Sequence, residues 1–233
     1  MLMNKHILIT GTSKGIGKYL AEYYVKKGNV VIGCSRREID FKDDNYKHFS
    51  LSINDETSVK KMFNEIRKDY GKIDILINNA GIASMNHSLL TSIGTVEKIL
   101  NTNLVGTFLF CRESAKIMQK NNFGRIINFT TVAVPLNLEG EAIYAASKAG
   151  VVSLTKILAK EFADFGITVN GIGPTPIKTD LIKSVPDEKI KKLIGHQAIK
   201  RFGRFEDVVN VINFFIKSKS DFVTGQTIYL GGI

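Results

Sequence analysis

Three glycines placed between a short apolar stretch and an amphipathic one constrain the fold of this chain most strongly. Residues 6–10 form the apolar stretch, and residues 11–17, Gly-Thr-Ser-Lys-Gly-Ile-Gly, follow it at once. Beyond them, Ile16, Leu20 and Tyr24 recur at helical spacing. A buried strand, a glycine turn and a helix in this order form a phosphate cradle, because the glycines admit a ligand close to the backbone and the helix N-terminus offers free N–H groups. The sequence therefore predicts a nucleotide-binding α/β protein.

The alternation of strand and helix continues along the whole chain. Strands are predicted at 5–10, 29–34, 46–51, 73–78, 124–130, 167–173 and 226–230, and helices at 15–27, 55–69, 94–120, 144–165 and 206–217. This order predicts a Rossmann-type, doubly wound, seven-stranded parallel sheet with helices on both faces. Because parallel strands end at one edge of a sheet, we expect the segments that follow them to share one cleft.

Length and composition fit one such domain. The 233 residues are 44% hydrophobic and no linker divides them, so we expect residues 1–233 to form a single dinucleotide-binding domain. The N-terminus leads directly into the first strand, and no apolar run approaches the roughly eighteen residues of a membrane span. We therefore expect a soluble, cytoplasmic protein. Cys34 and Cys111 are predicted to be small buried side chains, and no metal site is expected.

The formal net charge of +10 raises the question of nucleic-acid binding. The lysines are scattered between acidic residues and are not interleaved with aromatic side chains, which favours solvated helix faces over a nucleic-acid groove. We therefore predict no nucleic-acid partner. The alternative class, a nucleic-acid-binding protein, predicts a strongly salt-dependent affinity for DNA or RNA.

A tyrosine and a lysine four residues apart point to the chemistry. This spacing places Tyr144 and Lys148 on one face of a helix. There the ammonium is expected to favour the phenolate and to bring a reference pKa of about 10 towards neutrality. Such a phenol suits proton exchange with a carbonyl oxygen.

Six motifs, in order, make the chain resemble the short-chain dehydrogenase/reductase family from end to end. They are the turn at 11–17, Asn-Asn-Ala-Gly at 78–81, Asn103 with Leu-Val-Gly after it, the Tyr144/Lys148 pair, Pro174, and Thr-Gly-Gln at 224–226. The resemblance implies an oxidoreductase that interconverts a ketone and a secondary alcohol with a nicotinamide cofactor. The pattern is most similar to the 3-oxoacyl-acyl-carrier-protein reductase branch, which implies NADPH reduction of a β-keto thioester.

The resemblance also implies roles for individual residues. In the catalytic set, Tyr144 gives its proton to the carbonyl oxygen, Thr131 orients that oxygen, Lys148 lowers the tyrosine pKa and holds the nicotinamide ribose, and Asn103 positions a water that passes protons to Lys148. Thr131 stands where the family usually has serine, and its hydroxyl makes the same bonds. The residues expected to contact the cofactor are Gly11, Ser13, Lys14, Gly15, Ile16, Gly17, Ser35, Arg36, Arg37, Ser52, Ile53, Asn79, Ala80, Gly81, Tyr144, Lys148, Pro174, Ile177 and Thr179.

The residues after the second predicted strand favour NADP(H) over NAD(H). Family members that prefer NAD carry an acidic residue there for the adenosine ribose, whereas this chain reads Ser35-Arg36-Arg37. An arginine pairs well with a 2′-phosphate, and similar NADP-using proteins place a residue like Lys14 near the same group. Two further departures from the family are Ser52, where an Asp commonly recognises adenine, and Thr175, where Gly usually follows Pro174.

The substrate is less well defined. Residues 179–198 are predicted to form a helical flap over the cleft, with Leu181, Ile182, Val185, Ile190 and Leu193 as its apolar residues. Two arginines that dock the carrier protein in the fatty-acid enzymes are replaced by Asn122 and Phe165, which makes carrier docking doubtful, and Glu139 and Glu141 disfavour an anion. A reductase of sugars or other small polar carbonyls is therefore the alternative, and a catalytically silent NADP(H)-binding protein is the alternative of another class.

Assembly is inferred from the resemblance alone. Similar proteins form tetramers or dimers through their two long helices, here 94–120 and 144–165. We therefore expect a homo-oligomer, with outward faces that carry Phe108, Leu109, Val152 and Leu154.

Overall fold

A single parallel sheet of seven strands organises the computed structural model, which describes residues 4–182 and 185–233. The strand order is β3-β2-β1-β4-β5-β6-β7, so the predicted doubly wound, Rossmann-type sheet is confirmed. Each strand lies within two residues of its predicted range. The strands are β1 (His6–Thr10), β2 (Val30–Ser35), β3 (Tyr46–Ser50), β4 (Ile75–Asn78), β5 (Gly124–Phe129), β6 (Ile167–Gly173) and β7 (Thr227–Tyr229).

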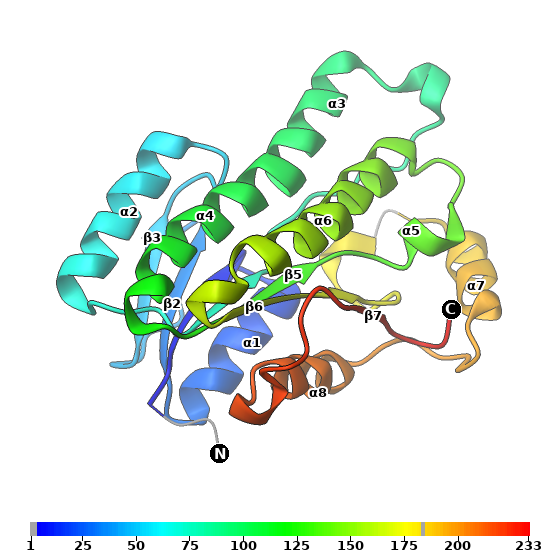
Figure 1. Ribbon diagram of the computed structural model, residues 1–233. Coiled ribbons are helices and arrows are strands. Elements are labelled where there is room, and N and C mark those ends of the chain that lie inside the picture. Colours follow the sequence, from blue (N-terminus) through cyan, green and yellow to red (C-terminus); the bar gives the residue numbers. More distant parts are fainter. Residues whose placement is uncertain (1–3, 183–184) are drawn as a thin grey trace.

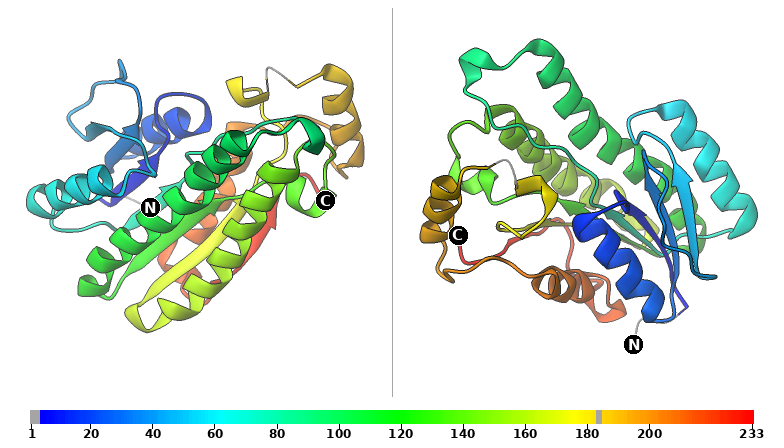
Figure 2. Two further views of the ribbon diagram at one scale, coloured as in Figure 1. Left: turned by 90° about the horizontal axis from the view of Figure 1, so that it is seen from above. Right: turned by 180° about the vertical axis from the view of Figure 1, so that it is seen from behind.

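Helices cover both faces of the sheet. Helices α2 (Glu56–Asp69), α4 (Gly106–Met118) and α6 (Ala142–Glu161) pack on one face, and α1 (Gly15–Lys26) and α8 (Phe205–Phe215) pack on the other, as Figures 1 and 2 show. Successive strand residues point to opposite faces, so each buried strand supplies two cores. Leu8 and Leu76 join the cluster under α2, α4 and α6, whereas Ile7 and Ile77 join the cluster under α1 and α8.

The helix predicted at 94–120 is not continuous. It consists of α3 (Ile93–Leu100), a π-helical turn at Asn101–Val105, α4, and a 3₁₀ turn at Gln119–Asn121. The extra residue of a π turn widens the backbone ladder locally, and such turns frequently occur at functional sites. Asn103 lies in this turn and is fully buried.

Two short helices lie between the longer elements. Helix α5 (Ala133–Leu136) follows β5, and α7 (Asp187–His196) lies between β6 and α8, within the predicted flap. The helical character expected for 179–198 is therefore found in α7, whose Ile190 is buried. Residues 183 and 184 and the side chain of Leu181 lie outside the described part of the flap. The remaining 3₁₀ turns are Ser88–Leu90, Ala163–Phe165, Asp180–Ile182 and Ser218–Ser220.

Helix α6 is more apolar than the sequence analysis allowed. Among the described residues it is the one helix that is long and apolar enough, by length and composition, to cross a membrane. By that measure the prediction that no such stretch exists was wrong. The helix packs on β6 and β5 and buries Tyr144 and Lys148, so its apolar character serves contacts within this domain.

The outward face predicted for the two long helices needs correction. Phe108 is 39% exposed, but Leu109 is buried and Leu154 packs against the core, so these two residues cover the sheet. The large apolar side chains that are exposed on these elements, besides Phe108, are Ile93, Val105, Ile157 and Phe165.

Both cysteines are free and buried in the core, as predicted. Burial raises the pKa of the Cys34 thiol and of the Cys111 thiol to about 12, so neither is a thiolate at neutral pH. Within residues 4–182 and 185–233, no three His, Cys, Asp or Glu side chains come together in a way that could hold a metal ion.

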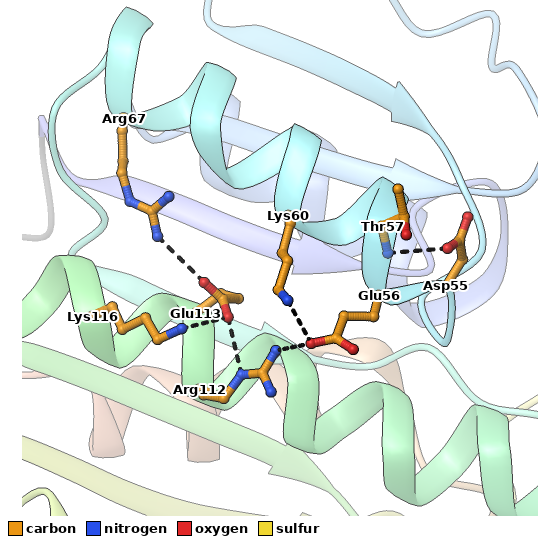
Figure 3. A network of polar contacts seen from close by, with 8 residues as sticks. All are labelled: Asp55, Glu56, Thr57, Lys60, Arg67, Arg112, Glu113 and Lys116. Carbon is orange, nitrogen blue, oxygen red and sulfur yellow. Dashed lines mark hydrogen bonds and ion pairs between the residues drawn. The ribbon is translucent and has the colours of Figure 1, made fainter.

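A buried carboxylate joins α2 to α4 (Figure 3). Glu113 of α4 is 3% exposed and accepts hydrogen bonds from Arg67 of α2 (3.3 Å), Arg112 (3.0 Å) and Lys116 (2.8 Å). Arg112 also donates to Glu56 at the start of α2 (2.7 Å). Burial alone would raise the pKa of Glu113, but the bonds from Lys116 and Arg112 outweigh it and lower the pKa.

We expect Glu113→Gln to lower the free energy of unfolding by about 1–3 kcal/mol at neutral pH, because it removes a charge that three cations share. Since the folded-state pKa of Glu113 is depressed, this stabilisation is complete above the unfolded-state pKa near 4.5 and is lost as the pH falls through the folded-state value. Urea unfolding as a function of pH measures it. Glu56→Gln, at an exposed partner of the same network, is the control and should cost less. A Glu113 variant as stable as the parent at neutral pH would contradict this account.

Candidate functional site

The glycine turn joins β1 to α1 as the sequence predicts. Gly11 and Gly15 have φ of +77° and +58°, a left-handed conformation that favours glycine. A Cβ on Gly17 would collide with the carbonyl oxygen of Gly11, so the third glycine lets α1 pack directly on the turn. No side chain caps the N-terminus of α1, which leaves its first N–H groups available to an anion.

The segment after β4 is fastened to the end of β1. Asn79 Nδ2 donates to the carbonyl oxygen of Thr10 (2.9 Å), and the N–H of Ala80 donates to Thr10 Oγ1 (2.9 Å). A Cβ on Gly81 would lie 3.3 Å from Asn103 Oδ1 and 3.4 Å from Lys148 Nζ. The segment therefore connects the glycine turn with the interior of α6.

Two adjoining cavities open along this edge of the sheet. The first, of about 440 Å³, lies at the glycine turn and the ends of β2 and β4. Its predicted lining residues are Gly11, Ser13, Lys14, Gly15, Ile16, Ser35, Arg36, Arg37, Ser52, Ile53, Asn79, Ala80, Gly81 and Thr179. The second cavity, of about 180 Å³, lies at the ends of β5 and β6. Its lining includes Thr131, Tyr144, Lys148, Pro174 and Ile177. Four predicted site residues line both cavities: Ile16, Asn79, Gly81 and Thr179. Of the predicted site residues, Gly17 and Asn103 line neither cavity and act from behind the wall.

These surfaces fit a dinucleotide. The larger cavity combines a helix N-terminus for a pyrophosphate with two arginines at its far end, and the smaller one brings the tyrosine and lysine next to it. Arg36 and Arg37 are exposed, and neither side chain makes a hydrogen bond or ion pair with any part of the chain that the structure describes. Both guanidinium groups are therefore available to a phosphate.

Lys14 lines the larger cavity, and the predicted contact with a 2′-phosphate stays a prediction. Its ammonium pairs with the carboxylate of Asp180 at 3.1 Å, and both residues line the larger cavity. The pair joins the glycine turn to the segment that follows β6. Ser52 lines the same cavity and donates a hydrogen bond to Asn54 Oδ1 (2.6 Å).

Tyr144 and Lys148 are both buried, with 8% and 4% of their surface exposed. Burial raises the pKa of Tyr144 to about 12, a hydrogen bond with Thr131 lowers it in part, and the charge of Glu141 raises it further. Burial lowers the pKa of Lys148 to about 8. Lys148 Nζ donates to the carbonyl oxygen of Phe129 (2.8 Å). The net shift of the Tyr144 pKa is therefore upward, opposite to the expected shift towards neutrality, because burial dominates.

Asn103 and Thr131 hold the walls of the smaller cavity together. Asn103 Oδ1 accepts from the N–H of Ile82 (2.9 Å), and its Nδ2 donates to the carbonyl oxygen of Ile82 (2.9 Å) and to Ser147 Oγ (3.0 Å). Thr131 Oγ1 accepts from the N–H of Ala133 (3.2 Å). The side chain of Asn103 thus anchors its turn, and its role with a water stays a prediction.

Several residues near the cavities were not predicted. Ser147, just before Lys148, donates to the carbonyl oxygen of Tyr144 (2.7 Å) and links Asn103 to α6. Asp180 comes from a segment for which the sequence offered no partner. Glu139 and Glu141 were both predicted to lie near the substrate; Glu141 lines the smaller cavity, whereas Glu139 lines a separate one.

Comparison with known proteins places this arrangement among oxidoreductases. A family model described as enoyl-(acyl carrier protein) reductase matches residues 11–232. The 3-oxoacyl-[acyl-carrier-protein] reductase of Salmonella typhimurium is 32% identical over 98% of this chain and 96% of its own length. The aldohexose dehydrogenase of Thermoplasma acidophilum superposes with a TM-score of 0.89 at 28% identity, over 99% of this chain and 94% of the other.

Two further solved structures contain a nicotinamide cofactor. The protein ElxO with NADP bound has a TM-score of 0.89 at 31% identity and covers 98% of this chain and 97% of its own. A 4-hydroxyisoleucine dehydrogenase complexed with NADH has a TM-score of 0.86 at 29% identity and covers 98% of each chain. The two carry different forms of the cofactor.

Proposed function

The chain belongs to the short-chain dehydrogenase/reductase family and is an oxidoreductase that acts on C=O and CH–OH groups with a nicotinamide cofactor. We propose that it uses NADP(H) to interconvert a ketone and a secondary alcohol. The observation that carries this proposal is the meeting of Tyr144, Thr131 and Lys148 in one cavity that adjoins the glycine turn.

The protein groups divide the work at the carbonyl. When bound, the nicotinamide supplies or accepts the hydride. Tyr144, with its raised pKa, stays protonated at neutral pH and gives its proton to the carbonyl oxygen in the direction of reduction. Thr131, in the same cavity as Tyr144, orients the same oxygen. Lys148 faces Gly81 and would hold the nicotinamide ribose, while Asn103 keeps the wall beside it in place.

The preference for NADP(H) is supported by the arginines at the end of β2. Arg36 and Arg37 line the larger cavity, and no acidic residue stands at the end of β2 to bind a free ribose. Glu38, the next acidic residue along the chain, accepts a hydrogen bond from Ser50 (2.6 Å).

For the substrate, the first candidate is a 3-oxoacyl thioester. The similarity to the 3-oxoacyl-[acyl-carrier-protein] reductases over nearly the whole chain supports it. Docking of the carrier protein itself is not part of the proposal, because Asn122 and Phe165 replace the arginines expected there.

A small hydroxylated carbonyl compound is the second candidate, and Glu141 favours it. Its carboxylate lines the cavity that holds Tyr144, and burial raises its pKa, with the charge of Lys189 opposing the shift. The carboxylate oxygens of Glu141 accept no hydrogen bond from any described residue, so they are free to accept one from a substrate hydroxyl. A plain acyl chain has no donor at that point.

We expect Glu141→Gln to lower kcat/KM for a hydroxylated ketone or sugar about tenfold, because it weakens a hydrogen bond to a charged group. For a simple ketone, kcat/KM should stay nearly unchanged. Glu139→Gln, whose side chain lines another cavity, is the matched control. Steady-state rates with both substrate types measure the effect. Equal losses for the two substrate types would remove the argument for the second candidate.

The proposed function is tested by following NADPH oxidation with β-keto thioesters, quinones, sugars and simple ketones in parallel. Turnover of one class identifies the substrate. Binding of NADPH without turnover of any member would instead support the catalytically silent alternative. Assembly as a dimer or tetramer and a cytoplasmic location remain predictions, and light scattering measures the first of them.

A further inference from the structure

A cluster of polar side chains links the glycine turn to the segment that carries the two arginines. We call it the β3 cluster, and it consists of Thr12, Ser35, Tyr46 and His48, with the carbonyl group of Arg37. The hydroxyl of Tyr46 lies 2.9 Å from Thr12 Oγ1 and 2.9 Å from His48 Nδ1. Nothing in the proposed chemistry uses this cluster.

The other ring nitrogen of His48 reaches the arginine segment. His48 Nε2 lies 3.0 Å from the carbonyl oxygen of Arg37 and 3.2 Å from Ser35 Oγ. Because a carbonyl oxygen only accepts, Nε2 carries the hydrogen and donates it. Ser35 Oγ donates to the same carbonyl oxygen (2.7 Å). Two donors therefore fix the peptide group that follows the side chain of Arg37.

The sequence makes room for this cluster at a cost. A Cβ on Gly33 would collide with the hydroxyl of Tyr46 and would lie 2.6 Å from Thr12 Oγ1, so only glycine fits in β2 beneath Tyr46. Thr12 is almost fully buried, and Tyr46 packs against Phe41 with ring centroids 5.0 Å apart. A glycine in the middle of a strand weakens that strand, so its presence in β2 fits a requirement for the tyrosine above it.

We propose that His48 is a positioning residue that sets the preference for NADP(H), because it holds Arg36 and Arg37 at a fixed place relative to the glycine turn. The inference rests on the proposed use of NADP(H). A dinucleotide whose pyrophosphate lies at the helix N-terminus and whose 2′-phosphate lies at the arginines needs these two sites at one separation, and the β3 cluster spans them. NADH has no 2′-phosphate, so its binding does not depend on where the arginines lie.

The test measures dissociation constants for NADPH and NADH without substrate, by calorimetric titration, in the parent chain and in His48→Ala. We expect His48→Ala to weaken NADPH binding about tenfold and NADH binding less than about twofold. The tenfold effect corresponds to the loss of one well-placed hydrogen bond and of the order that this bond imposes on the arginine segment. Adenosine 2′-monophosphate and adenosine 5′-monophosphate, used as small probes, should show the same contrast. Lys47→Ala, at an exposed neighbour on the same strand, is the control.

Rescue separates positioning from simple loss of structure. The side-chain amide of Gln reaches the place of Nε2 and donates to the same carbonyl oxygen, so His48→Gln should recover most of the NADPH affinity. Tyr46→Phe, which keeps His48 but cuts the link to Thr12, should fall between the parent and His48→Ala. Equal weakening of NADPH and NADH in His48→Ala, or unchanged binding of both, overturns the proposal. A parent chain with no preference for NADPH over NADH would instead overturn the proposed cofactor, and this inference with it.

Discussion

Replacing Tyr144 with Phe is expected to lower kcat by at least about 10³-fold, because the ring keeps its place while the proton donor is lost. The proposal assigns proton donation to the hydroxyl of Tyr144, which shares the smaller cavity with Thr131, whereas the ammonium of Lys148 donates to the carbonyl oxygen of Phe129. NADPH binding should remain within about twofold of the parent, since the larger cavity is untouched. Stopped-flow or steady-state NADPH oxidation measures the first effect, and titration measures the second.

The control for this variant is Tyr70→Phe, which removes a hydroxyl at the end of α2, away from both cavities. Its rates should match those of the parent. If Tyr144→Phe kept a large fraction of the parent activity, the assignment of the proton donor would be wrong, whatever the substrate.

Replacing both Arg36 and Arg37 with Ala is expected to raise KM for NADPH about 10²-fold, because each charge-assisted bond to a phosphate contributes about 1.5–3 kcal/mol and exposure reduces that value. KM for NADH should change less than about threefold, and kcat should be unaffected, since the arginines lie at the end of the cleft away from Tyr144. Steady-state kinetics with both cofactors measures the two constants.

The matched control removes the same charge elsewhere. Lys26→Ala with Lys27→Ala lowers the net charge by two at the exposed end of α1, outside the cleft. A purely long-range attraction between a basic protein and an anionic cofactor would make both double variants alike and would depend on ionic strength. Equal effects of the arginine variant on NADPH and NADH would refute the assigned preference.

Much of the fold could be predicted because the buried strands are nearly continuous apolar runs. β1 and β4 centre on the apolar runs Ile7-Leu8-Ile9 and Ile75-Leu76-Ile77, and such runs bounded by polar segments are hard to mistake for loops. The break between α3 and α4 could not be predicted in the same way. The apolar period continues through the π turn at Asn101–Val105, and hydrophobic spacing does not report a single extra residue in the backbone ladder.

The site illustrates a different limit. The spacing of Tyr144 and Lys148 correctly places both on one face of α6, but it carries no information about burial. Burial is what raises the tyrosine pKa and lowers the lysine pKa, and the ammonium turns to a backbone carbonyl. For the same reason Leu109 was assigned to an outer surface although it faces the sheet.

Contacts between distant segments were the least predictable. The pair of Lys14 and Asp180 joins residues 166 positions apart, and each side chain is unremarkable in its own stretch of sequence. His48 lies on a short edge strand with alternating exposed and half-buried residues, where a histidine is ordinarily solvated. Tyr46 packs over Gly33 and contacts the imidazole of His48, whose other nitrogen reaches the carbonyl group of Arg37.

The order of the strands separates the residues proposed to select the cofactor from the residues proposed to catalyse the reaction. β3 lies at one edge of the sheet and pairs with β2, while Tyr144 and Lys148 lie in the cavity at the ends of β5 and β6, on the other side of β1 and β4. Under the proposed function, substitutions at this edge of the sheet alter the choice between NADPH and NADH while they disturb few neighbouring strands. Such substitutions do not touch the cavity that holds Tyr144, so related proteins can differ in cofactor preference and still catalyse the same type of reaction.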